Sequence, residues 1–176
     1  MTVRAILMSF VALLLFAAPA AAEKPNPAFA GRIMLSDKRF PYQAKSLAAY
    51  NAAVNKQSKT SFFEDKEKKW KIYFAGFLKA PLNDVEYVVK LYELSGRGQQ
   101  LIATIEQFTD SRGQVSLLSN LTLERKTIGA NKQLLITIEN NGKVLASNKF
   151  KILGTQEKFT GKVDFSEDEA NGKIEE

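Results

Sequence analysis

The strongest short structural signal of this chain lies in Gln133-Leu-Leu-Ile-Thr-Ile-Glu139, Asn140-Asn-Gly142 and Val144-Leu-Ala-Ser-Asn-Lys-Phe-Lys-Ile-Leu153. Leu134, Ile136 and Ile138 fall on one face of an extended chain, and Phe150 and Ile152 do the same in the following stretch. Asn-Gly tolerates the positive φ angles that a type I′ turn requires at its two central residues. The segment is therefore predicted to form two antiparallel strands joined by a tight turn.

The same pattern recurs on both sides of this hairpin. Seven stretches of strand character, separated by turn signals, cover residues 70–77, 85–94, 100–108, 115–125, 133–139, 144–153 and 158–165, and a shorter one covers 31–36. Short connections between such strands favour antiparallel hairpins over long crossovers. We therefore expect an all-β domain over residues 31–165, a two-sheet antiparallel β-sandwich of immunoglobulin-like type, with a closed barrel as the alternative.

A single helix is predicted within the mature chain, over residues 43–56. Leu47, Tyr50 and Val54 are spaced i, i+3 and i+7, which places them on one helical face. The segment is also rich in alanine and has no β-branched run, so its intrinsic helix propensity is high.

The N-terminus is typical of a secretory signal peptide. Arg4 precedes an uncharged run from Ala5 to Ala18, and Pro19 comes before the small-residue site Ala20-Ala-Ala22. A membrane anchor is the alternative, but the apolar run is at the short end of the roughly 17–25 residues that a span needs. We expect a signal peptide at 1–22, cleavage after Ala22, an extended leader at 23–30, and a periplasmic or secreted protein.

The composition excludes several kinds of chemistry. The chain has 176 residues, no cysteine and no histidine. Disulfides, thiolate nucleophiles, Ser-His-Asp triads and the usual zinc sites are therefore ruled out. We expect no cofactor, and no metal either, because the acidic residues after Asp168 lack a ligand at the third position of a calcium loop, where Ala170 stands.

Charge is distributed unevenly along the chain. The net charge is +6, but residues 38–79 carry ten basic and three acidic side chains, whereas residues 164–176 carry one and six. Residues 166–176 lack an apolar period and are predicted to form a disordered acidic tail. For an exported protein a basic first half indicates lipid head groups, acidic polysaccharide or other envelope proteins as anionic partners, and not nucleic acid.

Carboxylates are the remaining acid–base groups. The candidates are Glu64, Asp65, Glu86, Glu93, Glu106, Glu124 and Glu139. A glycosidase needs two carboxyls facing each other across a cleft, and sequence spacing cannot place such a pair. Each candidate fits a solvated position, so an enzyme is only the third hypothesis.

The densest basic group is the candidate binding site. It consists of Lys66, Lys68, Lys69 and Lys71, with Trp70 among them. One interpretation is a contact patch for an anionic surface with Trp70 as its aromatic anchor. The other is a charged loop that enters a strand whose tryptophan lies in the core, as in many sandwiches.

Three stretches carry a family resemblance. They are Gly31-Arg-Ile-Met-Leu-Ser-Asp37 with Phe40-Pro41, Trp70-Lys-Ile-Tyr-Phe-Ala-Gly-Phe77, and Phe150-Lys-Ile-Leu-Gly154 followed by Gly161-Lys-Val-Asp-Phe165. With them the chain resembles small secreted proteins of delta-proteobacteria, mainly myxobacteria, that have no assigned function. The resemblance implies a Gram-negative envelope setting and brings no catalytic motif.

The sequence therefore predicts a non-catalytic, exported β-sandwich module that binds another envelope protein. The resemblance implies the role of an accessory subunit in a periplasmic motility or secretion assembly. A carbohydrate- or anionic lipid-binding module that uses Trp70 and the neighbouring lysines is the alternative. The oligomeric state is left open.

Overall fold

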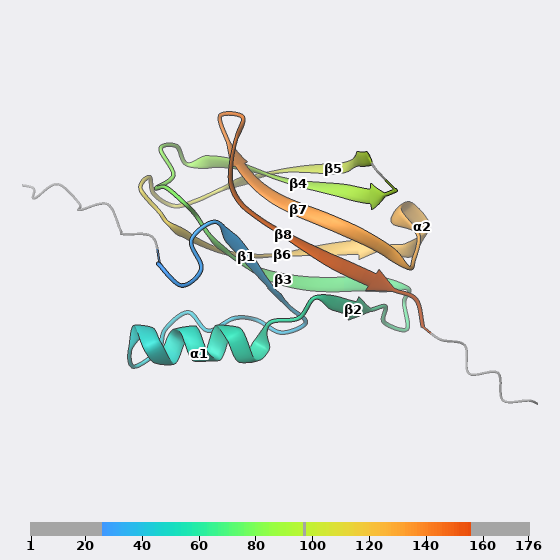
Figure 1. Ribbon diagram of the computed structural model, residues 1–176, viewed down its shortest axis with the longest axis horizontal. Helices are drawn as coiled ribbons and strands as arrows, with labels where there is room; N and C mark the ends of the chain where they lie inside the picture. Colours follow the sequence, from blue (N-terminus) through green and yellow to red (C-terminus); the bar gives the residue numbers. More distant parts are fainter. Residues whose placement is uncertain (1–25, 97, 156–176) are drawn as a thin grey trace, which may run out of the picture.

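The computed structural model describes residues 26–96 and 98–155, and its described part is dominated by β-structure (Figure 1). The strands are β1 (Arg32–Ser36), β2 (Ser61–Phe63), β3 (Lys69–Phe77), β4 (Glu86–Ser95), β5 (Gly98–Phe108), β6 (Ser116–Glu124), β7 (Lys132–Asn140) and β8 (Lys143–Leu153), and the helices are α1 (Leu47–Gln57) and α2 (Arg125–Ile128). The predicted signal peptide (1–22), the predicted strand at 158–165 and the predicted acidic tail (166–176) lie outside the described residues.

The hairpin predicted over residues 133–153 is confirmed as β7 and β8. β7 and β8 pair in antiparallel fashion from Lys132↔Ile152 to Asn140↔Lys143. Asn141 and Gly142 have φ angles of 49° and 75°, the left-handed values that a type I′ turn requires. Leu134 and Ile136 are fully buried, so the predicted inner face is confirmed.

The strands form one mixed sheet, which differs from the two antiparallel sheets that were predicted. The strand order is β5-β4-β7-β8-β1-β3-β6, and β2 also pairs with β8. Both β1 and β2 run parallel to β8, β1 through the single register pair Arg32↔Ser147. The reason is that β1 and β2 pair with the side of β8 that faces away from β7. Because β1 also pairs with β3, the strands join into one continuous sheet.

The sheet curls into two arms that enclose one core (Figure 1). We call β5, β4, β7 and β8 the hairpin arm and β1, β3 and β6 the helix arm. Buried side chains from both arms belong to the same apolar cluster, including Ile72 and Phe74 from β3 and Ile138 and Phe150 from the hairpin. Burial of these apolar side chains in one shared core contributes to holding the two arms together.

Helix α1 covers the outer face of the helix arm. It begins after Ser46, whose hydroxyl accepts a hydrogen bond from Ala49 N at 3.2 Å and caps the helix. Val54 is fully buried with Ala75 and Phe77 of β3, whereas Leu47, predicted on the same face, is 57% exposed. The helix is confirmed, but it begins at the cap and not at residue 43.

The described part of the predicted extended leader is instead a turn. Ala30 N donates to Asn26 O at 2.9 Å, and the Phe29 ring lies 4.8 Å from the Phe77 ring, centroid to centroid. Burial of the Phe29 side chain explains why residues 26–30 fold back onto the domain.

Candidate binding edge beside strand β6

The predicted basic site lies in the turn before β3 and in the first part of that strand. Trp70 is 1% exposed, and its Nε1 donates to Leu153 O at 3.0 Å. Trp70 thus lies in the core and cannot present its ring to a ligand, which corrects its assignment as an aromatic anchor. Side chains alternate along a strand, so neighbouring Lys69 and Lys71 point outward when Trp70 points inward.

Two of the predicted lysines are paired with nearby carboxylates. Lys68 Nζ lies 3.3 Å from Glu64 Oε1, and Lys69 Nζ lies 3.2 Å from Glu67 Oε2. Lys66 is exposed in the turn. Lys71 differs from the others, because its Nζ lies 5.7 Å from the centroid of the Tyr73 ring, within range of a cation–π interaction.

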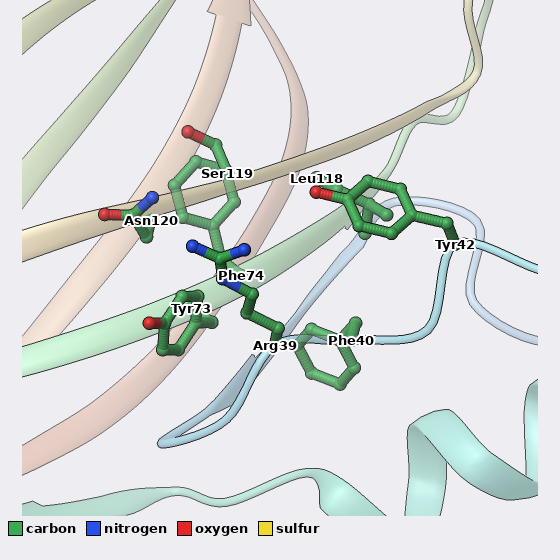
Figure 2. Close-up of a pocket in the computed structure, with 8 residues that line it drawn as sticks. All are labelled: Arg39, Phe40, Tyr42, Tyr73, Phe74, Leu118, Ser119 and Asn120. Atoms are coloured by element: carbon green, nitrogen blue, oxygen red, sulfur yellow. The ribbon is translucent and has the colours of Figure 1, made fainter.

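Beside Tyr73 lies a cavity of about 220 Å³ that the sequence did not predict (Figure 2). We call it the Arg39 pocket. Its lining residues come from the loop after β1 and from β3 and β6: Arg39, Phe40, Tyr42, Tyr73, Phe74, Leu118, Ser119 and Asn120. Hydrogen bonding with Lys71 and Arg39, and to a smaller extent their positive charge, lowers the pKa of the Tyr73 phenol. The pocket therefore combines cationic and aromatic groups on the outer surface of the helix arm.

Strand β6 forms the open edge of the sheet next to this pocket. Its nine residues pair with β3 from Lys69↔Glu124 to Phe77↔Ser116 without a register shift, and no strand among the described residues pairs with its other side. Edge strands that avoid pairing with other chains usually carry lysine, proline or a bulge. β6 contains no lysine, arginine or proline, and its register with β3 is free of bulges.

β5, at the opposite end of the strand order, is less suited to pairing. Its register with β4 shifts between Leu91 and Tyr92, which marks a bulge. A bulge bends the strand and interrupts the row of backbone groups that an added strand would need. β6 is therefore the better candidate for an interaction along its backbone.

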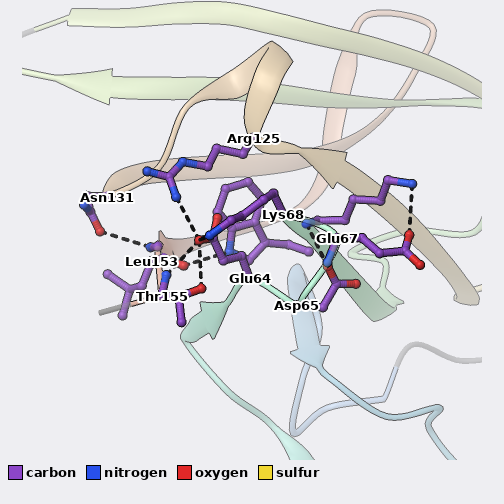
Figure 3. A network of polar contacts seen from close by, with 11 residues as sticks. Glu64, Asp65, Glu67, Lys68, Arg125, Asn131, Leu153 and Thr155 are labelled. Atoms are coloured by element: carbon purple, nitrogen blue, oxygen red, sulfur yellow. Dashed lines mark hydrogen bonds and ion pairs between the residues drawn. The ribbon is translucent and has the colours of Figure 1, made fainter. Parts of the chain in front are cut away.

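A second polar cluster surrounds Glu64 where the described chain ends (Figure 3). Its side chain is fully buried, and Oε1 accepts from Thr155 N at 2.9 Å, Thr155 Oγ1 at 2.8 Å and Arg125 Nη1 at 2.9 Å. The backbone N–H of Thr155 is the main cause that lowers the pKa of this carboxyl to about 2. Glu64 therefore stays ionised near neutral pH and is unsuited to act as a general acid.

Glu139 is a second buried carboxylate, on the outer face of the hairpin arm. It is 6% exposed and accepts from Lys90 Nζ at 2.7 Å and from Thr137 Oγ1 at 2.9 Å. Burial raises the pKa of this carboxyl, but the two donors outweigh it and the pKa is lower than usual. The prediction that the candidate carboxylates are solvated is thus wrong for Glu64 and Glu139, because each is buried with donors from distant segments.

Within residues 26–96 and 98–155, no group of three or more acidic side chains is placed to hold a metal ion. In the same part of the chain, no helix has the length and apolar character to cross a membrane. Searches of protein-family models and of curated proteins find no match to this chain.

Proposed function

We propose that the protein is an exported, non-catalytic binding module that adds an extended segment of another envelope protein to the open edge of β6. The open edge of β6 is the main support for this function, because its nine residues pair with β3 in continuous register and include no lysine, proline or bulge. Strand addition of this kind takes its affinity from main-chain hydrogen bonds and its specificity from pockets for alternate side chains.

The Arg39 pocket supports the same function, because it can receive a side chain of the added strand and so provide specificity. Asn120 and Leu118 of β6 line it together with Tyr73, which is the register partner of Asn120. A segment paired to β6 would place every second side chain on this outer face, beside the pocket.

The proposed cellular location is based on the sequence. The signal peptide at 1–22 with cleavage after Ala22 favours a periplasmic or secreted location, and the family resemblance favours a Gram-negative envelope. An accessory subunit of a motility or secretion assembly fits both. We further propose that the two arms correspond to the layers of an immunoglobulin-like sandwich joined along one side, since they pack across one core.

Site-specific crosslinking in the producing cells tests this function. A photo-crosslinking residue is placed at Thr122 on β6 and, as a matched control, at Thr104 on the other edge strand; both threonines are exposed. We expect a covalent adduct with one envelope protein from position 122 and none from position 104. Recovery of monomer alone from both positions would contradict the proposal.

A strand-blocking variant makes this test specific for backbone pairing. Successive N–H groups of a strand point to opposite sides, so one of Ser119→Pro and Asn120→Pro removes an N–H directed away from β3. The proline variant that melts like the wild type identifies that position. This variant is expected to abolish the adduct from Thr122, and an undiminished adduct would show that the partner does not pair with β6.

Binding to an anionic envelope surface is the second candidate function. It is favoured by two exposed aromatic residues that lie beside basic side chains. Tyr42 is 77% and Phe63 is 67% exposed, and cavities that they line also contain Arg39, Lys59 and Lys71. This function predicts salt-sensitive binding to vesicles that contain anionic lipid. Arg39→Glu plus Lys71→Glu should abolish that binding, and Lys68→Glu plus Lys69→Glu should weaken it less because both lysines are already paired. Binding that ignores salt and both double substitutions would remove this candidate.

A further inference from the structure

We propose that the Arg39 pocket receives a carboxylate side chain of the added segment, so that the partner of β6 is an extended segment with an acidic residue on its outward face. This inference rests on the proposed function, because it assigns the specificity of the same edge.

The charge of the pocket favours an anionic ligand. Arg39 is exposed and lines the cavity, and Lys71 stands over the ring of Tyr73, which lines it as well. Among the described residues no carboxylate oxygen lies within 4.0 Å of either cation, whereas neighbouring Lys59, Lys68 and Lys69 each have such a partner. The guanidinium of Arg39 lines the cavity, and the ammonium of Lys71 stands over the Tyr73 ring at its border. Positive charge without an acidic partner makes the cavity complementary to an anion.

The pocket lies within reach of a strand added to β6. Tyr73 on β3 is the register partner of Asn120 on β6, and both line the pocket. A strand added beyond β6 lies about 4.8 Å further out, so a residue opposite Asn120 is separated from Tyr73 by about two strand spacings. Figure 2 shows the Arg39 side chain extending from its loop toward Tyr73 and Asn120. Side chains as long as glutamate and arginine span that separation.

The side chains that line the pocket suit a carboxylate. A guanidinium binds a carboxylate through two parallel N–H···O hydrogen bonds, and such charge-assisted bonds are stronger than neutral ones. Asn120 adds a neutral polar group at the same cavity, and Phe40 and Tyr42 form apolar walls for the stem of the incoming side chain. The pocket therefore favours glutamate or aspartate over a basic or purely apolar residue.

Selection from a displayed library of random seven-residue peptides tests the inference on the mature chain. We expect selected peptides to bind β6, seen as slower amide hydrogen exchange in residues 116–124, and to share one acidic position. Synthetic peptides with Glu→Gln at that position should bind about tenfold more weakly, the effect of one lost charge-assisted pair. Arg39→Ala should produce the same loss for the acidic peptide and leave the glutamine peptide unaffected.

The matched control is Arg32→Ala, which removes an exposed arginine at the opposite end of β1 and should leave the acid preference intact. Peptides that protect β6 without any acidic preference would overturn this inference and leave the proposed function standing. Failure to select any peptide that protects β6 would contradict both. Equal loss of affinity in Arg39→Ala and Arg32→Ala would show that the acidic preference comes from the overall positive charge and not from the pocket. That result would overturn the inference.

Discussion

Gly76 on β3 lies directly against the Ile138 side chain of β7, so that a Cβ atom at position 76 would overlap Ile138 Cδ1. These two residues belong to different arms of the sheet, whose strands are linked through β8 and β1. The contact shows that the arms approach each other as closely as a backbone and a side chain allow. Glycine is needed at position 76 for space and not for its backbone angles, since its φ is not positive.

Gly76→Ala is therefore expected to destabilise the protein by about 1–3 kcal/mol, the usual cost of overpacking a core. Ile138→Val removes the overlapping methyl group and should recover part of that loss in the double variant. Urea unfolding measures both changes. Gly98→Ala serves as the control, because the nearest atom to its added Cβ is 3.8 Å away. Unchanged stability in Gly76→Ala would contradict the close packing of the arms.

Glu64→Gln is expected to lower the melting temperature at neutral pH, because the amide cannot replace the ionised partner of Arg125 and Lys68. The folded pKa of Glu64 is about 2 and its ordinary value is 4.5, so this stabilisation is present above pH 4.5 and is lost as the pH falls toward 2. The difference between wild type and variant should therefore shrink over that range. Thermal melts at several pH values measure it.

The control for this pH dependence is Glu106→Gln, which changes an exposed carboxylate on β5. It should leave the melting temperature close to that of the wild type throughout. A Glu64→Gln difference that stays constant from pH 7 to pH 3 would show that the charge of Glu64 does not stabilise the fold.

Trp70 is the single tryptophan of the chain and is 1% exposed, so its fluorescence reports on the core. We expect emission at short wavelength and little quenching by acrylamide in the folded protein, with both properties unchanged by Lys68→Glu plus Lys69→Glu. Trp70→Phe should cost about 1–3 kcal/mol through lost packing. Quenching as strong as in the unfolded chain would mean that Trp70 is at the surface after all.

The sequence predicted the elements that depend on neighbouring residues. The β7–β8 hairpin follows from alternation and an Asn-Gly turn, and α1 follows from the spacing of Tyr50 and Val54. The parallel pairing of β1 with β8 joins Arg32 to Ser147, which are distant in the chain, so no local pattern marks it. The three-residue strand β2 is too short to show a period.

The candidate site was harder to predict for the same reason. The density of lysines predicts a binding site at residues 66–71. However, strand alternation directs Trp70 into the core, and Glu64 and Glu67 pair with two of the lysines. The Arg39 pocket depends on the register that places Tyr73 beside Asn120. The local sequence offers only the basic and aromatic run from Lys38 to Tyr42, which carries no binding motif.

Amide hydrogen exchange along β6, with and without a bound peptide from the library selection, tests whether a partner segment pairs with this strand. Only those N–H groups of Ser116–Glu124 that point away from β3 are left for an added strand. We predict that alternate amides of β6 exchange more slowly when the peptide is bound, while the exchange rates of the β5 amides do not change. Protection of β5, or no alternating protection in β6, would contradict it.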